Sequence, residues 1–336
     1  MKLYKIMFFN MMVMGTIIAT SSYSWFSMWM GLEINLLSII PLMSTQKNSL
    51  SSESAIKYFV TQALASLILL MAAIMMMLIN EFITPLVNYH FLMIMNSALL
   101  TKLGAAPFHF WFPEVMEGLT WLNCMIMLTW QKIAPMTLIM NNSMNPTFST
   151  LIIISCLLTS AMMVFNQISL RKILTFSSIN HIAWMISTTM MSSSSWLIYF
   201  AVYCLINMNI IMIFKMTNTF YLKQINNIIN TNKTIKFSYM MNFLSLGGLP
   251  PFIGFLPKWI VINWLVNNNM YTIATTMIIL TLIMLYVYMR ITFSSMLLNH
   301  NEPKIIKLKI NKMAINTINF MTLFSLITCT LIFNLL

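Results

Sequence analysis

Long apolar runs alternate with short polar breaks along nearly the whole chain. Each run is long enough for a membrane-spanning helix, which needs about 20 residues. Eleven runs can be delimited, with approximate bounds 6–22, 25–43, 56–79, 89–112, 120–140, 148–168, 173–191, 196–216, 237–266, 270–290 and 313–335. This pattern predicts an all-α polytopic membrane protein with about eleven transmembrane helices, forming a single membrane domain over 1–336.

The composition excludes a soluble protein. Hydrophobic residues make up 59% of the 336 residues and charged residues only 7%, whereas a soluble domain carries about 25% charge. Intrinsic disorder is excluded as well, because it requires low hydrophobicity. The longest polar breaks, near 217–236 and 292–312, leave no room for a soluble domain.

The positive charge of the chain gives its orientation. Lysine and arginine number 18 against six acidic residues, for a net charge of +12. In a soluble protein this balance would suggest nucleic acid, but membrane proteins gather basic residues on one side. An eleven-span path places 15 of the 18 on the side of the N-terminus: Lys2, Lys5, Lys47, Lys57, Arg171, Lys172, Lys215, Lys223, Lys233, Lys236, Arg290, Lys304, Lys307, Lys309 and Lys312. We therefore predict an inside N-terminus, an outside C-terminus and no nucleic-acid partner.

The same count bears on the first apolar run. Lys2 and Lys5 before an apolar stretch also resemble the start of a signal peptide. Removing that segment would disturb the distribution of basic residues, so we expect the segment to stay.

Three lysines lie inside apolar segments. Lys102 and Lys132 are about ten residues, or about 15 Å, from either end of their segments, too far for easy snorkelling. Lys258 lies in a longer, interrupted segment. A charge there costs at least ~2.5–3.5 kcal/mol, so a functional role is favoured. Glu33 is a mid-segment acid, and His181 is a mid-segment histidine that is either a core residue or part of a proton relay.

Two segments share a motif that combines glycine and proline. Gly104, Pro107, Phe108 and Pro113 match Gly248, Pro251, Phe252 and Pro257 with a constant offset of 144. The two segments are five spans apart and would cross in opposite directions. This predicts an inverted-topology repeat in which the fourth and ninth segments are discontinuous helices. The halves would be about 1–140 and 148–290, followed by a C-terminal helix at 313–335.

Motifs for cofactors or metals are missing from the sequence. The four cysteines form no C-x-x-C pair, and no dinucleotide or phosphate-binding glycine motif occurs. A Ser–His–Asp set is excluded because the chain has no aspartate. We therefore expect no metal and no redox cofactor in this chain. Proton transfer between buried ionisable groups is the chemistry that the sequence still allows.

The chain resembles the NADH–ubiquinone oxidoreductase chain 2 family, antiporter-like membrane subunits of respiratory complex I, in its animal, arthropod-like mitochondrial form. The similar stretches are Trp29–Asn35, Gly104–Gly118, Thr129–Pro135, Leu170–Trp184 and Leu244–Trp259. Animal members resemble longer bacterial subunits without three N-terminal helices, which fits the short start here.

The resemblance implies roles for the buried groups. Glu33 and Lys102 would form the ion pair at the head of a proton channel. Lys132 would be the connecting lysine, Lys258 the terminal lysine, and His181 a central-axis histidine. The chain would then be a proton-translocating subunit of NADH:ubiquinone reductase that performs no redox chemistry itself.

The resemblance also implies surroundings. NADH, FMN, iron–sulfur clusters and ubiquinone would be bound by partner subunits, both membrane and peripheral. The chain would lie in the mitochondrial inner membrane among lipids such as cardiolipin, with its N-terminus in the matrix and its C-terminus in the intermembrane space.

Two other functions stay open at this point. A sodium–proton antiporter subunit of the same ancestry would share Glu33 and Lys102, so these residues do not discriminate. A non-transporting scaffold would use its buried charges only to hold helices together, and Lys102→Met would then leave pumping intact.

Overall fold

The computed structural model describes residues 3–44, 48–79, 85–142, 144–229 and 233–297, and five further positions between 317 and 324. Most of the expected C-terminal helix at 313–335 lies outside the described residues, as do Lys2, Lys47 and the lysines between 304 and 312. The chain forms two compact units, Met1–Cys156 and Leu157–Leu336, and each is described by itself.

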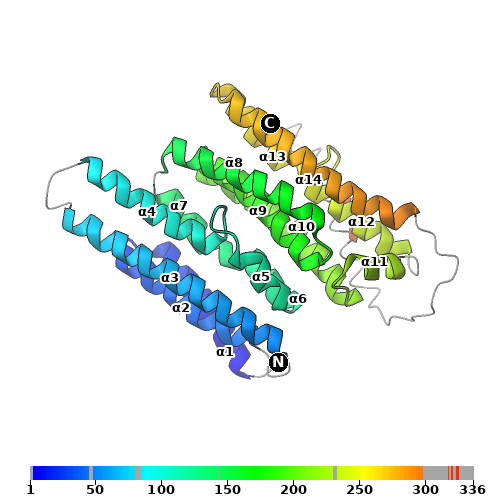
Figure 1. Cartoon of the computed structure of the whole chain (residues 1–336), viewed down its shortest axis with the longest axis horizontal. Helices are drawn as coiled ribbons and strands as arrows, with labels where there is room; N and C mark the ends of the chain where they lie inside the picture. Colours follow the sequence, from blue (N-terminus) through cyan, green and yellow to red (C-terminus); the bar gives the residue numbers. More distant parts are fainter. Residues whose placement is uncertain are drawn as a thin grey trace. The chain divides into compact units, whose positions relative to one another are not determined.

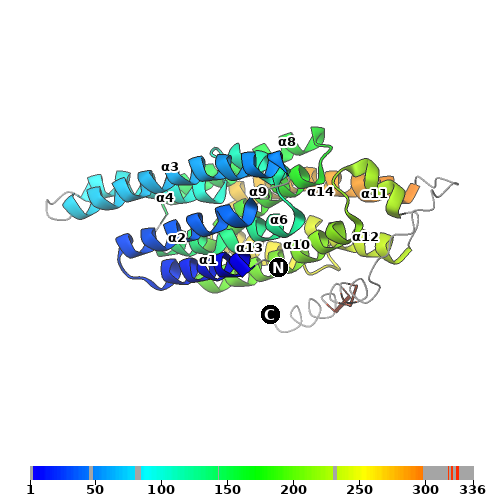
Figure 2. The ribbon, with the colours of Figure 1, turned by 90° about the horizontal axis from the view of Figure 1, so that it is seen from below.

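The first unit is built from helices that pack side by side (Figures 1 and 2). Its elements are α1 (Leu3–Ser21), α2 (Trp25–Met43), α3 (Ser49–Ile79), α4 (Pro85–Leu103), α5 (Trp111–Gly118), α6 (Trp121–Leu128), the 3₁₀ turn η1 (Trp130–Lys132), α7 (Ile133–Asn141) and the first part of α8 (Pro146–Met163). The third helix packs against α2, α4 and α5, and α7 packs against α1 and α4.

Glycines allow α1 and α2 to approach closely. A Cβ atom on Gly15 would lie 2.8 Å from the backbone nitrogen of Asn35, and one on Gly31 would lie 2.5 Å from that of Ala19. Such distances leave no room for a methyl group. Small residues at helix crossings are typical of membrane proteins, where association depends on close packing.

The second unit contains the rest of α8 and the helices that follow it. They are the 3₁₀ turn η2 (Val164–Asn166), α9 (Leu170–Thr189), α10 (Ser193–Thr217), α11 (Leu222–Ile229), α12 (Lys233–Gly247), α13 (Phe255–Asn267) and α14 (Tyr271–Leu297). Helix α10 contacts α9, α12 and α13, and α14 packs on α11, α12 and α13. Nearly every side chain of α9 is buried, so α9 lies inside its unit.

Local signals explain where several helices begin and end. The Ser24 hydroxyl accepts a hydrogen bond from the Ser27 backbone at the start of α2, and Ser192 does the same for Ser195 at the start of α10. Asn218 ends α10 in the left-handed conformation, with φ 51°. Serine and asparagine are favoured at these positions.

The prediction of a helical membrane protein is confirmed at the level of fold class. Among the described residues, six helices are long and apolar enough to cross a membrane: Leu3–Ser21, Trp25–Met43, Ser49–Leu78, Pro146–Asn166, Ser193–Thr217 and Tyr271–Phe293. The 19 residues of α1 span about 28 Å, close to the thickness of the hydrocarbon core. The number of eleven spans stays a prediction.

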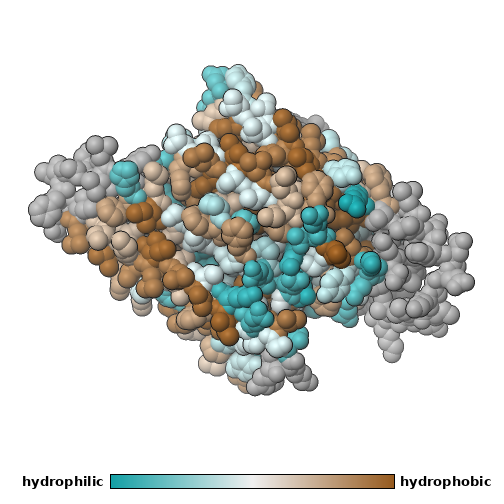
Figure 3. All heavy atoms as spheres, in the orientation of Figure 1, coloured by the Kyte–Doolittle hydropathy of each residue, from teal (hydrophilic) through white to brown (hydrophobic). Residues whose placement is uncertain are grey.

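The outer surface fits a lipid environment. Leu64, Leu67 and Met71 of α3 are 57%, 60% and 52% exposed. Figure 3 shows apolar residues over much of the visible face. A water-soluble monomer rarely exposes apolar patches of this extent, so these side chains are suited to hydrocarbon.

Candidate functional site

The first glycine–proline motif interrupts the helix that carries Lys102. Helix α4 ends at Leu103, and Gly104 follows with φ +73°. The Gly104 N–H donates to the Thr101 carbonyl at 3.1 Å, and the Ala105 N–H donates to the Leu100 carbonyl at 3.1 Å. This is a Schellman ending, which favours glycine because its φ is positive. The next residues are not helical until α5 begins at Trp111 (Figure 1).

The second motif repeats this backbone geometry at the same offset of 144. Helix α12 ends at Gly247, and Gly248 has φ +76°. Its N–H donates to the Ser245 carbonyl at 3.1 Å, and the Leu249 N–H donates to the Leu244 carbonyl at 3.4 Å. Helix α13 then begins at Phe255, which corresponds to Trp111. The matched sequences therefore share a local structure, while their crossing of a membrane as discontinuous helices stays a prediction.

Lys102 lies in the last turn of α4 and is 8% exposed. It borders a cavity of about 20 Å³ in the first unit, and its other lining residues are Leu32, Asn35, Leu36, Tyr58, Gln62, Gln131 and Pro135. Tyr58 and Gln62 lie four positions apart on α3 and so share one face of that helix. This cavity has room for about one water molecule.

The cavity is lined by neutral polar groups that do not belong to the predicted relay. The Asn35 amide donates to Gln131 Oε1 at 3.0 Å, and the Gln131 amide donates to Asn35 Oδ1 at 2.9 Å. The Tyr58 hydroxyl donates to Gln131 Oε1 at 3.4 Å. Neutral polar residues are common in apolar segments, so the signal for Asn35 and Gln131 was their place beside Glu33 and Lys132 in stretches that share the family resemblance.

Glu33 lies on α2 and is half-buried. Its charge acts electrostatically on Lys102 within the first unit. Among the described residues, no direct ion pair joins the two side chains. The ion pair that the family resemblance implies is therefore not among the contacts of the described residues, and the role of Glu33 and Lys102 stays a prediction.

Lys132 is the last residue of η1 and is 2% exposed. The expected continuous helix over 120–140 is interrupted here, because α6 ends at Leu128 and α7 begins at Ile133. Pro135 explains the interruption: its ring nitrogen cannot donate to the Gln131 carbonyl and the ring clashes with that carbonyl. Lys102 and Lys132 therefore both lie where a helix is interrupted.

His181 lies in the middle of α9 and is buried. Its Nδ1 atom is 2.9 Å from the Tyr199 hydroxyl, and its ring lies 5.2 Å from that of Tyr203. Both tyrosines belong to α10. The imidazole is therefore hydrogen-bonded to a hydroxyl group, which is compatible with either a core role or a relay role.

Lys258 lies in the first turn of α13 and is 7% exposed. Its ammonium donates to the Gly247 carbonyl at 2.9 Å and to the Leu246 carbonyl at 3.4 Å, at the end of α12. It also lies 5.8 Å from the centre of the Trp184 ring, within the range of a cation–π contact. Trp184 follows His181 by three positions on α9, so Lys258 contacts the face of α9 that carries His181.

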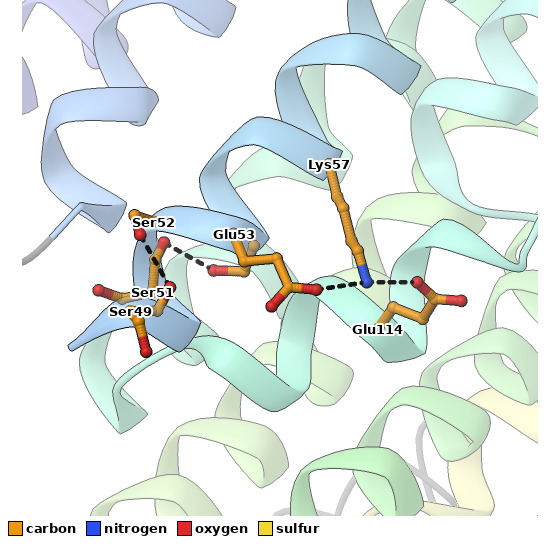
Figure 4. A network of polar contacts seen from close by, with 7 residues as sticks. Ser49, Ser51, Ser52, Glu53, Lys57 and Glu114 are labelled. Atoms are coloured by element: carbon orange, nitrogen blue, oxygen red, sulfur yellow. Dashed lines mark hydrogen bonds and ion pairs between the residues drawn. The ribbon is translucent and has the colours of Figure 1, made fainter.

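A second group of charges lies at the surface of the first unit (Figure 4). Lys57 on α3 lies 3.0 Å from Glu53 on the same helix and 2.9 Å from Glu114 on α5. All three side chains are accessible, with 42%, 59% and 57% exposure. Lys57 joins α3 to α5 through Glu114, but accessible pairs contribute little to stability.

Comparisons with known proteins agree with this architecture. The model of the family described as NADH:quinone oxidoreductase/Mrp antiporter, TM, matches residues 22–284. The chain is 48% identical to NADH-ubiquinone oxidoreductase chain 2 of Aedes aegypti over 98% of each chain. It is 49% identical to that of Anopheles gambiae over 88% of this chain and 86% of the relative.

Solved structures show the same fold at low sequence identity. A chain of respiratory complex I from Thermus thermophilus superposes with a TM-score of 0.87 at 18% identity, covering 98% of this chain and 78% of that one. A chain of the Mrp complex from Dietzia sp. DQ12-45-1b gives 0.77 at 15% identity, covering 88% and 61%. From the family model and the insect relatives, the chain belongs to the NADH-ubiquinone oxidoreductase chain 2 family and is a membrane subunit of respiratory complex I.

Proposed function

We propose that this chain provides a proton-translocation path of complex I through Glu33, Lys102, Lys132, His181 and Lys258. One observation carries the proposal. Each of the three lysines is buried, and each lies beside an interruption of a helix. Interrupted helices leave backbone groups free to bind water or ions, and these are tolerated in a membrane only inside protein or a cavity.

The chemistry follows from charge interactions. A carboxylate near a lysine favours the ammonium form, and withdrawing that negative charge favours release of the proton. The electrostatic coupling between Glu33 and Lys102 supplies such a control point. Moving one charge through a membrane potential costs ~2.3 kcal/mol per 100 mV, so charge changes in partner subunits can drive protons along the path.

The finer membrane arrangement is part of the same proposal. The chain has about eleven spans, with discontinuous helices at the fourth and ninth, in the mitochondrial inner membrane. Its N-terminus faces the matrix and its C-terminus the intermembrane space, which the distribution of lysine and arginine supports. Partner subunits bind NADH, FMN, the iron–sulfur clusters and ubiquinone, and lipids such as cardiolipin surround the helices.

The substitution Lys102→Met in assembled complex I tests the proposal. It removes the ammonium but keeps a flexible apolar side chain. We expect proton pumping and NADH:quinone turnover to fall about tenfold or more, as expected for loss of a proton-transfer group, with normal assembly on native gels. Glu33→Gln should act in the same direction.

Lys57→Met is the matched control, because it removes the same charge from an accessible side chain. It should leave turnover unchanged. Wild-type pumping per NADH in assembled Lys102→Met complex would contradict the relay and support the scaffold. Sodium counterflow from reconstituted wild-type complex would instead favour the alternative, a sodium–proton antiporter subunit. A chain of the Mrp complex shares this fold.

A further inference from the structure

Several polar side chains beside Lys102 have no part in the lysine relay, and three of them are hydrogen-bonded to one another. Asn35, Tyr58 and Gln131 come from α2, α3 and η1, and all three line the cavity that Lys102 borders. Asn35 and Tyr58 are each 4% exposed. Polar groups buried in an apolar protein cost free energy unless they are hydrogen-bonded, so their meeting at one cavity requires a reason.

The two amides form a closed pair. Each donates one N–H to the oxygen of the other, at 2.9 and 3.0 Å. Gln131 Oε1 also accepts the Tyr58 hydroxyl, which uses both of its lone pairs. Each amide nitrogen has two N–H groups, so the pair retains one further donor on each side. The orientation of both side chains is therefore set, with donors left for another molecule.

The cavity fits water rather than a metal cation. Its volume of about 20 Å³ suits one water molecule, which needs two to four polar partners. The free groups of the amide pair are mainly N–H donors, which do not coordinate cations, and Lys102 adds a positive charge to the same space. Hard cations need about six oxygen ligands, and this lining does not supply them.

We propose that the Asn35–Gln131 pair is a positioning element that holds a water molecule beside Lys102 as the proton carrier toward Lys132; this rests on the proposed function. Gln131 directly precedes Lys132 in η1, so the same turn connects the cavity to the next lysine. The water accepts one amide N–H and donates one O–H to the remaining lone pair of Asn35 Oδ1. Its other lone pair takes the proton from the Lys102 ammonium, and the water then gives a different proton to the neutral amine of Lys132. Only N–H and O–H bonds change, and the amides keep their own protons.

The test uses assembled complex I with Gln131→Met, which removes both hydrogen-bonding groups at similar length. We expect the number of protons pumped per NADH to fall and proton-coupled turnover to drop about tenfold, which corresponds to one lost hydrogen bond in the rate-limiting step. The solvent deuterium isotope effect on turnover should change as well, because the carrier water is no longer held.

Asn142→Leu is the matched control. Asn142 donates to Asn96 at 3.2 Å, so the substitution breaks another buried amide–amide hydrogen bond of the first unit, away from the cavity. It should keep the wild-type pumping ratio and isotope effect. If Asn142→Leu and Gln131→Met lowered the pumping ratio equally, the positioning role would be overturned. Loss of any buried amide hydrogen bond would then impair pumping to the same extent.

If Gln131→Met fails to assemble, Tyr58→Phe decides. It removes only the hydroxyl that donates to Gln131, and a lower pumping ratio supports the proposal, whereas a wild-type ratio and isotope effect overturn it. The proposed function is judged separately by Lys102→Met. One outcome would overturn only the water-positioning role and leave the proposed function standing. In it, Lys102→Met impairs pumping, whereas Gln131→Met and Tyr58→Phe pump like the wild type.

Discussion

At the scale of single residues, Gly248 and Lys258 share one small space. A Cβ atom on Gly248 would lie 2.9 Å from Lys258 Nζ and 3.0 Å from its Cδ. Gly248 also has φ +76°, which a residue with a side chain adopts at a cost of about 1–2 kcal/mol. The glycine therefore has two functions: it permits the turn, and it leaves room for the lysine side chain.

Gly248→Ala should accordingly displace Lys258 and lower both stability and turnover. We expect a loss of about 1–2 kcal/mol in stability and a reduced pumping ratio. Gly247→Ala is the control, because its Cβ would meet Leu285 at 3.6 Å, an ordinary contact. Thermal denaturation and proton pumping of both variants provide the measurement, and similar behaviour of the two would disprove the steric account.

The burial of the three lysines could be predicted from the sequence, whereas the cavity beside Lys102 could not. A charge in an apolar segment has few explanations, so Lys102, Lys132 and Lys258 were recognisable from sequence alone. Asn35 and Gln131 are neutral and lie 96 residues apart. Their meeting depends on how α2 and η1 pack, which the hydrophobic pattern does not encode.

At the scale of elements, the crossing of α1 and α2 depends on Gly31. Its Cβ would approach the backbone of Ala19 to 2.5 Å, and backbone cannot move aside as a flexible side chain can. Gly31→Ala should force α1 and α2 apart and cost about 1–3 kcal/mol, the usual range for overpacking. The amount of assembled complex I after a mild heat challenge checks this, with Gly247→Ala as reference. Unchanged heat resistance would show that the crossing tolerates the methyl group.

Helix positions were predictable wherever an apolar run was uninterrupted. The runs at 25–43 and 196–216 correspond closely to α2 and α10. The run at 120–140 was not one helix, and Pro135 was the sequence signal that could have shown this. Helix α11 lies in the expected loop at 217–236, where the buried Ile225 gives the segment a contact that composition alone does not reveal.

At the scale of the whole molecule, the position of the basic loops can be measured. Lys215 and Lys223 are accessible in the structure, and the proposed topology places both on the matrix side. A membrane-impermeant amine reagent should modify them in inverted inner-membrane vesicles and leave them unmodified in mitoplasts. Modification in detergent-treated membranes is the control for reactivity, and labelling confined to mitoplasts would reverse the topology.

The fold class was predictable at this scale because composition dominates it. With 7% charged residues, few architectures other than a bundle of membrane helices can satisfy the backbone. The division into the units Met1–Cys156 and Leu157–Leu336 was less accessible. It depends on contacts between helices distant in sequence, such as those of α10 with α12 and α13.

The hydrogen bonds of Lys258 connect chemistry to backbone mechanics. Its ammonium holds the last two carbonyls of α12, and a neutral amine would offer fewer and weaker donors. Under the proposed relay role, each departure of a proton from this nitrogen loosens the end of α12, and each arrival tightens it. Faster amide hydrogen exchange at Gly248 and Leu249 in Lys258→Met would show that the Lys258 ammonium stabilises the end of α12.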